Sequence, residues 1–133
     1  MKYICLGYYD PAKVENMSES ERNAMFDACF SYDDELRRNG HFASGEAIGP
    51  ANTAMTVSWK NEKVAVTDGP YAETKEQLGG ILMLEARDLN QAIQLMSQHP
   101  AVKYGSSFEI RPIADMTEMI EGSEQRRRKN TSI

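Results

Sequence analysis

The feature that most constrains the fold is a run of apolar residues that does not alternate with polar ones. Ile81-Leu82-Met83-Leu84 is apolar at every position, and Ile4-Cys5-Leu6 repeats the pattern near the start of the chain. A strand with one solvent-facing side alternates apolar and polar residues, whereas an unbroken apolar run is typical of a strand buried on both faces. The fold therefore has to supply two apolar layers, one on each side of a sheet.

Two helices are predicted to form one of these layers. Ser18 and Glu21 have the spacing of a capping box, and Gly40 supplies a left-handed stop, so a helix is expected between them. Asp88 caps a second helix, which ends before Pro100. The apolar stripes comprise Met25, Cys29, Tyr32 and Leu36, widened by Phe26 and Phe30, in the first helix, and Leu89, Ala92, Ile93 and Met96 in the second.

Strands are predicted at six places, where short alternating or apolar runs end in turn residues. With the helices they give the order strand, helix, strand, hairpin, strand, helix, strand. This order predicts an α+β, ferredoxin-like split βαβ plait with an inserted β-hairpin, in which both helices cover one face of an antiparallel sheet. The other face then needs a second copy of the sheet, so we expect a homodimer. The strands are expected at residues 3–9, 42–48, 53–59, 63–67, 78–86 and 107–113.

Length and charge limit the classes of function. A chain of 133 residues fits one domain, expected over residues 1–115, followed by a polar tail at 116–133 that is mobile or docked on a partner. The net charge of −5 argues against a nucleic-acid-binding surface. The basic run at residues 126–129 is short and balanced by acidic residues, so it favours a solvated tail.

The cysteines and the apolar runs indicate the compartment. Cys5 and Cys29 have no metal-ligand spacing and are expected to be unbonded, buried in the core and inert to thiol reagents. No apolar run approaches the roughly 20 residues of a membrane span, and the N-terminal run is too short for a signal peptide. We therefore expect a cytoplasmic protein with no membrane partner and no metal or other cofactor.

The most distinctive stretch runs from Asp68 to Gly80, with the sequence DGPYAETKEQLGG. It resembles the signature of the DGPF group within the YCII-related family, with Tyr71 where phenylalanine is usual. Other segments agree with that family in the same order, so the resemblance covers residues 1 to about 113. These segments are residues 1–3, 40–46, 53–57, 99–106 and 109–113.

The resemblance implies a ferredoxin-like plait that forms a dimeric α/β barrel. Relatives in that superfamily include muconolactone isomerase-like enzymes and cofactor-free monooxygenases, and members of the DGPF group occur beside or fused to extracytoplasmic-function sigma factors. A His–Asp pair has been suggested as catalytic in the YciI branch. That pair is not carried over here, because no histidine lies in the first predicted strand or the first predicted helix.

Several side chains are candidates for acid/base chemistry. Asp68 or Glu46 would act as the base, His41 as the acid, and Lys75 would stabilise charge. Each also has a structural interpretation. Asp68 suits a turn, Glu46 an ion pair with Arg111, and His41 the C-terminal end of a helix. His99, at the end of the second helix, is interpreted in the same structural way.

The remaining candidates would bind a ligand. Gly69 and Pro70 would shape the mouth of a cleft, or only complete a turn. Glu73 and Glu76, with Lys75, would surround a polar ligand, or form a solvated loop. The aromatic residues that would line a pocket, or belong to the core, are Tyr8, Tyr9, Trp59 and Tyr71.

Two functions remain open from the sequence. The first is a cofactor-independent enzyme that acts on a small polar or aromatic metabolite by acid/base chemistry. The second is a non-catalytic ligand-binding or docking module, linked to transcription through a sigma-factor partner. Under the first, we expect Asp68 at the rim of a cleft shared with Glu46 and the first strand, since the segment after the hairpin must return past one end of the sheet.

Overall fold

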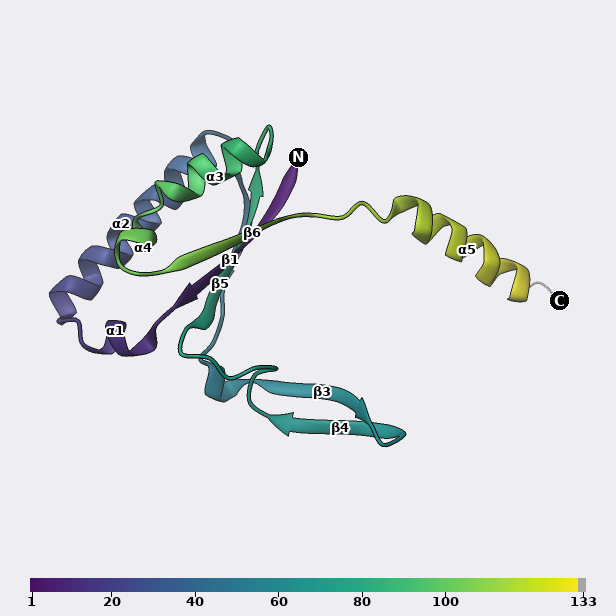
Figure 1. The fold of residues 1–133 in the computed structure, drawn as a ribbon. Helices are drawn as coiled ribbons and strands as arrows, with labels where there is room; N and C mark the ends of the chain where they lie inside the picture. The colour runs from purple at the N-terminus through teal and green to yellow at the C-terminus, as the bar shows by residue number, and fades with distance from the viewer. Residues whose placement is uncertain (132–133) are drawn as a thin grey trace.

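The computed structural model describes residues 1–131 and is built on a four-stranded antiparallel sheet (Figure 1). The strand order is β2 (Phe42–Ala47), β5 (Gln77–Glu85), β1 (Lys2–Tyr9) and β6 (Ser107–Pro112). The two strands with unbroken apolar runs, β1 and β5, therefore lie side by side at the centre. Their central position agrees with the apolar runs, and burial of their second face stays a prediction.

The helices lie together on one side of this sheet (Figure 1). The long helix α2 (Glu19–Arg38) and the helix α3 (Leu89–Ser97) are those expected from the sequence. Two single-turn helices, α1 (Pro11–Glu15) and α4 (Pro100–Lys103), were not predicted. The arrangement is the predicted α+β, ferredoxin-like split βαβ plait with an inserted hairpin.

The ends of α2 follow the predicted local chemistry. The Ser18 hydroxyl accepts a hydrogen bond from the Glu21 amide at 3.1 Å, and its own proton goes to the Glu21 carboxylate. At the other end Gly40 has a φ of +78°, the left-handed conformation that glycine adopts without a steric cost. The capping box and the glycine stop are both confirmed.

The core lies between the helices and the central strands. Side chains alternate along β1, so that Tyr3 and Cys5 are buried beneath the helices while Ile4 and Leu6 point the other way and are only half-buried. The buried cluster comprises Tyr3, Cys5, Leu36, Leu82, Leu84, Ala86, Ala92 and Met96. The second apolar face of the sheet, which we call the open face, has Ile4, Leu6, Ile81 and Met83 at its centre, and no helix lies on it (Figure 1).

Parts of the expected helix stripes lie outside this core. Phe26 and Phe30 are 45% and 62% exposed and stack on each other, with ring centroids 6.2 Å apart. Leu89 and Ile93 of α3 are also about half exposed, so only Ala92 and Met96 of that stripe are buried. In α2 the reason is a cavity beneath the stretch from Met25 to Arg37, which takes the place of packed side chains.

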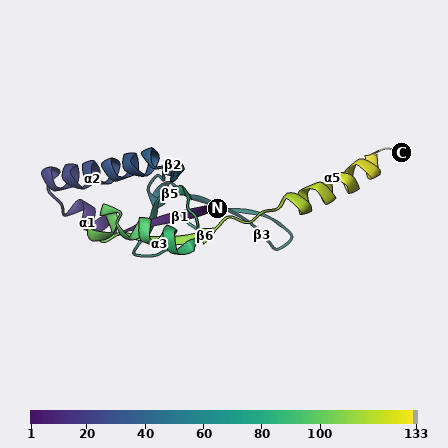
Figure 2. The ribbon, with the colours of Figure 1, turned by 90° about the horizontal axis from the view of Figure 1, so that it is seen from above.

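The inserted hairpin extends away from the body of the domain (Figures 1 and 2). It follows a short 3-10 turn, η1 (Ala51–Thr53), and pairs β3 (Met55–Lys60) with β4 (Lys63–Asp68) as a separate two-stranded sheet. Asn61 and Glu62 form its tight turn, with φ values of 53° and 63°. The hairpin was predicted, but its detachment from the main sheet was not.

The C-terminal segment forms α5 (Thr117–Thr131), which also extends away from the domain (Figure 1). It is polar apart from Met116, Met119 and Ile120, which are 48%, 67% and 51% exposed. No helix within residues 1–131 combines the length and the apolar character needed to cross a membrane. The end of the expected tail, residues 132 and 133, lies outside the described residues.

Candidate active site

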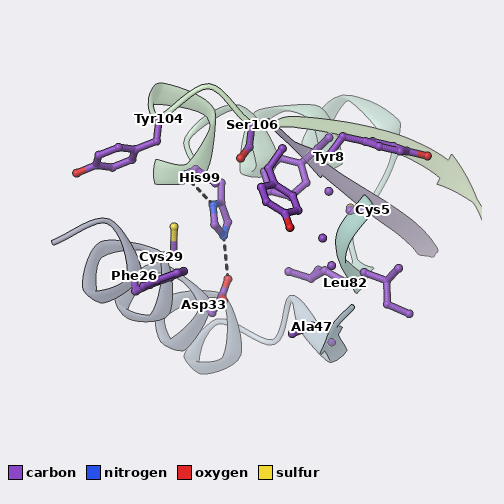
Figure 3. A pocket seen from close by; sticks show the side chains of 18 of the residues that line it. Cys5, Tyr8, Phe26, Cys29, Asp33, Ala47, Leu82, His99, Tyr104 and Ser106 are labelled. Carbon is purple, nitrogen blue, oxygen red and sulfur yellow. Dashed lines mark hydrogen bonds and ion pairs between the residues drawn. The ribbon is translucent and has the colours of Figure 1, made fainter. Parts of the chain in front are cut away.

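A cavity of about 590 Å³ lies between α2, α4 and the helix-covered face of the sheet (Figure 3). The floor of the cavity is formed by β1, β2 and β5 at positions occupied by glycine, which has no side chain. Gly7 and Gly80 are direct partners across β1 and β5, and Gly45 lies opposite Leu82, so all three positions face the helices. The cavity exists because glycines occupy positions where large side chains would otherwise fill the space beneath α2.

The walls of the cavity are mainly aromatic and apolar. The side chains that line the cavity come from segments near both ends of the chain, because β1, β2 and β6 belong to the same sheet beneath α2. The aromatic residues that line it are Tyr8, Tyr9, Phe26, Phe30, Phe42, Tyr104 and Phe108. Such a lining suits a flat, largely apolar ligand with a few polar groups.

The polar centre of the cavity is a histidine–aspartate pair (Figure 3). His99 Nε2 lies 3.0 Å from Asp33 Oδ1, and both residues line the cavity. His99 is 6% exposed, whereas the Asp33 side chain is 21% exposed. The pair joins α2 to the start of α4, two segments that are 66 residues apart in sequence.

Hydrogen bonds and aromatic neighbours fix the orientation of the His99 ring. Its other nitrogen, Nδ1, accepts a hydrogen bond from the Ala101 amide at 3.2 Å. Because the amide can only donate, Nδ1 carries no proton, and Nε2 must be the nitrogen that donates to Asp33. The rings of Tyr32 and Phe108 meet the imidazole edge-on at centroid distances of 5.3 Å and 5.1 Å. Neither ring nitrogen of His99 is left to accept a proton from a ligand.

Asp33 is therefore the group of the pair that faces the cavity. Its Oδ1 is held by His99, and within residues 1–131 its Oδ2 makes no hydrogen bond or ion pair. A carboxylate oxygen at the wall of an apolar cavity, with its partner oxygen fixed by a neutral N–H, is suited to accept a proton.

Cys29 lies one helical turn before Asp33 and lines the same cavity. Burial raises the pKa of its thiol, and the negative charge of Asp33 raises it further. Cys5 is fully buried beneath the helices, and burial raises the pKa of that thiol to about 11. Both cysteines are free, as predicted, but the expectation that both lie in a sealed core is wrong for Cys29, which is half-buried at the cavity wall.

A second charged group lies at the edge of the cavity. The buried Asp10 caps α1 by accepting the Ala12 amide at 3.0 Å, and Lys75 Nζ approaches its Oδ2 at 3.7 Å. Lys75 belongs to the segment that resembles the DGPF signature, and the last residues of that segment, Gly79 and Gly80, line the cavity itself. Glu73 and Glu76, the neighbours of Lys75 in the expected charged cluster, are exposed and do not line the cavity.

Asp68 and its neighbours lie at the base of the hairpin. Asp68 pairs with Met55 at the end of β4, and Gly69 has a φ of +101°. The Gly69 amide donates to the Ala54 carbonyl at 2.8 Å, and its carbonyl accepts from the Thr56 hydroxyl at 2.8 Å. These bonds fit the turn interpretation. Asp68, Gly69 and Pro70 do not line the cavity, so the expected cleft shared by Asp68 and Glu46 is not formed within this chain.

Glu46 and Tyr9 do border the cavity, but Glu46 shares its face of the sheet with Ile81, away from the helices. The expected ion pair between Glu46 and Arg111 is wrong, because β2 and β6 are the two opposite edges of the sheet. Arg111 instead pairs with Glu109 on its own strand.

His41 lies at the far end of β2, where its Nδ1 is 2.8 Å from the Glu85 carbonyl oxygen. It does not line the cavity. Trp59 and Tyr71, which were considered as pocket aromatics, are 69% and 94% exposed and do not line it either. Of the predicted catalytic residues, the structure therefore brings only Glu46 to the border of the cavity.

Sequence reasoning missed Asp33 and assigned His99 only a helix-end role. One signal for Asp33 was available: it follows Met25 and Cys29 at successive spacings of four, so a carboxylate lies on the apolar side of the helix. Its partner depends on a contact between distant segments, which periodicity does not reveal. Within the described part of the chain, no group of three or more His, Cys, Asp or Glu side chains is arranged to hold a metal ion.

Comparison with known proteins places this chain in a family. The family model of the YCII-related domain matches residues 1–117. The chain belongs to the YCII-related family. An uncharacterised protein of Rhizobium meliloti (strain 1021) is 27% identical over 118 residues, which cover 86% of this YCII-related chain and 93% of that relative.

A solved structure shares the fold of this YCII-related protein. It is 5-chloro-2-hydroxyhydroquinone dehydrochlorinase (TftG) from Burkholderia phenoliruptrix AC1100, in complex with 2,5-dihydroxybenzoquinone. The TM-score is 0.52, the identity is 15%, and the match covers 86% of this chain and 94% of that one. At this identity the likeness shows the fold, and it agrees with the fold class predicted from the sequence.

Proposed function

We propose that this protein is a cofactor-independent enzyme that transfers a proton on a small aromatic metabolite, with Asp33 as the catalytic base. The observation that carries the proposal is the contact of 3.0 Å between Asp33 and the buried His99 at the wall of an apolar cavity. A carboxylate held in this way is oriented before the ligand arrives, which favours proton transfer.

The roles within the pair follow from their hydrogen bonds. His99 Nε2–H donates a hydrogen bond to Asp33 Oδ1, which orients the carboxylate. Asp33 Oδ2 then accepts a proton from a ring hydroxyl of the ligand and passes it to a ring carbon. On a chlorinated hydroquinone that carbon is the one that bears chlorine, and loss of a second hydroxyl proton to water breaks the C–Cl bond, so that chloride leaves and a hydroxyquinone remains. His99 is a positioning residue in this proposal, since it acts on the ligand only through Asp33.

The class of substrate follows from the cavity. Its volume of about 590 Å³ falls within the ~300–1,000 Å³ usual for small-molecule sites, and its aromatic lining favours stacking on a planar ring. A ring that carries at least one hydroxyl would supply the proton that Asp33 accepts. The ligand of TftG, a dihydroxylated quinone, is a compound of this chemical class.

We further propose that the protein works in the cytoplasm as a homodimer that pairs through the open face. Two unbonded cysteines are typical of a reducing compartment. The open face carries half-buried apolar side chains, Ile4, Leu6, Ile81 and Met83, with no helix on it. Sedimentation at micromolar concentration should give twice the 15.0 kDa of one chain. A clean monomer would remove this part of the proposal.

The first experiment uses the unmodified protein and two probes. Titration with 2,5-dihydroxybenzoquinone, called below the probe quinone, should give saturable changes in its visible absorbance. Release of chloride from 5-chloro-2-hydroxyhydroquinone, called below the chlorinated probe, should exceed the uncatalysed rate in buffer. If the protein neither binds the first compound nor acts on the second, this substrate class is excluded and the proposal fails in its present form.

The alternative function is a docking module that contacts a sigma factor. The exposed apolar side of the β3–β4 hairpin is the observation that favours it, because such a surface is typical of a protein contact. This alternative predicts that an extracytoplasmic-function sigma factor binds the protein, and that Asp33→Asn leaves the binding unchanged. Loss of binding on changing Asp33 would argue against it.

A further inference from the structure

The hairpin has one strongly apolar face. Residues paired across two antiparallel strands point to the same side, and here Val57 pairs with Val66 and Trp59 with Val64. With Met55 they form a continuous surface, which we call the hairpin patch. Its members are Met55, Val57, Trp59, Val64 and Val66, each between 58% and 69% exposed.

The opposite face of the same hairpin is different in character. It carries the small or hydroxylated side chains of Thr56, Ser58, Ala65 and Thr67. Apolar and polar side chains therefore alternate along both strands, as in a strand pair with one solvent-facing side and one buried side. Isolated two-stranded hairpins are marginally stable in water, and this one forms no ladder with the four-stranded sheet. Both observations indicate that the hairpin patch is covered in the working protein.

The chain's own α5 does not provide that cover. The apolar side chains Met119 and Ile120 of α5, and Met116 just before it, are themselves about half exposed or more, and the helix extends separately from the hairpin (Figure 1). The helices of the body lie on the other side of the sheet (Figure 1).

The position and size of the hairpin patch identify the occupant. The hairpin extends to the side of the sheet that lacks helices, which is the side of the open face (Figures 1 and 2). The five side chains of the hairpin patch each offer on the order of 100 Å² of apolar surface, which gives roughly 500 Å² in total. This is less than the roughly 800 Å² that each partner buries in a stable interface. The open face adds the half-buried side chains of Ile4, Leu6, Ile81 and Met83 on the same side of the sheet, so one partner that covers both surfaces is the simplest cover.

We propose that the hairpin patch is buried against a second copy of this chain, in the same interface as the open face. The hairpin then acts as an arm that reaches across to the partner, and a two-fold axis gives each copy the same contact twice. This proposal does not depend on the function of the cavity, and it adds a named surface to a dimer otherwise joined through the sheet alone.

Trp59 allows a direct test, because it is the single tryptophan of the chain and lies within the hairpin patch. Its emission is measured from micromolar to nanomolar concentration, alongside the mass by sedimentation. The proposal predicts blue-shifted emission in a dimer, and a red shift wherever dilution gives monomer. Emission typical of a solvent-exposed tryptophan in a dimer would overturn the proposal. Emission typical of a buried tryptophan in a monomer would also overturn it, because the chain would then cover its own hairpin patch.

A matched pair of variants completes the test. V57T/V66T changes one cross-strand pair in the hairpin patch to near-isosteric polar residues, while S58T/A65T changes the next pair on the opposite face. The first should weaken dimerisation at least tenfold and red-shift Trp59, and the second should change neither. An unchanged dissociation constant for V57T/V66T would overturn the proposal. The emission of the unmodified protein decides the matter even if a variant hairpin fails to form.

Discussion

His99 has no spare hydrogen-bonding capacity. Its two ring nitrogens are occupied by the Ala101 amide and the Asp33 carboxylate, and its faces are enclosed by Tyr32 and Phe108. Because the Ala101 amide donates to Nδ1, the ring nitrogen that donates to Asp33 is Nε2. The chemistry then passes to Asp33, which lines the cavity.

The buried thiol of Cys5 makes stability fall at alkaline pH. Burial raises its pKa from 9.0 to about 11, so the unfolded thiol loses its proton before the folded one. Between these values the folded state binds more protons, and stability decreases as the pH rises. The loss should be about 2 kcal/mol by pH ~10.5, which urea unfolding at pH ~8 and ~10.5 would measure.

Cys5→Ala is the control for this effect. The variant will be less stable at neutral pH because it leaves a small void, but its further loss between the two pH values should be smaller. A remaining slope is expected from Cys29 and Tyr32, since burial also raises the pKa of both groups. An identical alkaline loss in Cys5→Ala and the unmodified protein would show that Cys5 is not its source.

At the scale of the elements, the cavity depends on glycines in neighbouring strands. A Cβ at Gly80 would lie 3.4 Å from the Glu46 carbonyl oxygen, which leaves room for a side chain on the cavity floor. Gly80→Val should therefore fill part of the cavity. We expect it to weaken binding of the probe quinone at least tenfold while leaving the melting temperature unchanged or raised, because valine favours strands.

The comparison variant is Ile4→Val, which lies on the open face of β1 and does not line the cavity. It should bind the probe quinone as the unmodified protein does. Calorimetric titration and thermal unfolding of both variants provide the two readouts. Normal binding by Gly80→Val would mean that the ligand does not occupy the glycine-floored part of the cavity.

The elements that sequence predicted are those with a local signal. The unbroken apolar runs of β1 and β5, the capping box at Ser18 and the stop at Gly40 each depend on neighbouring residues, and each is confirmed. The single-turn helices α1 and α4 were missed because one turn carries no periodicity. The resemblance over residues 1 to about 113 supplied the plait and the family, which the match to residues 1–117 confirms.

The candidate site was harder to predict for a physical reason. The signature from Asp68 to Gly80 drew attention because its residues are contiguous, yet its first part closes the hairpin. The cavity instead joins β1, α2, α4 and the ends of β2 and β5. Asp33 and His99 meet only after the whole plait has folded, and neither lies in a motif of its own.

At the scale of the whole molecule, we expect residues 1–115 to fold without the C-terminal segment. Nearly all side chains of α5 are exposed, and the Thr117 amide that begins it bonds only to Asp115 nearby. Truncation after Asp115 should shift the melting temperature by a few degrees at most, corresponding to about 1 kcal/mol or less. Scanning calorimetry at one protein concentration would measure it. A much larger loss would show that α5 docks on the domain or on its partner.

The proposed chemistry depends on Asp33 as the acid/base group of the cavity, and one pair of variants tests this role most directly. Asp33→Asn keeps the shape of the side chain but removes its basicity. Asp34→Asn makes the same change one residue along, on an exposed carboxylate paired only with Arg37 at 2.8 Å. Chloride release from the chlorinated probe should fall at least a hundredfold in Asp33→Asn and remain normal in Asp34→Asn. Equal rates in the two variants would contradict the assignment of Asp33 as the base.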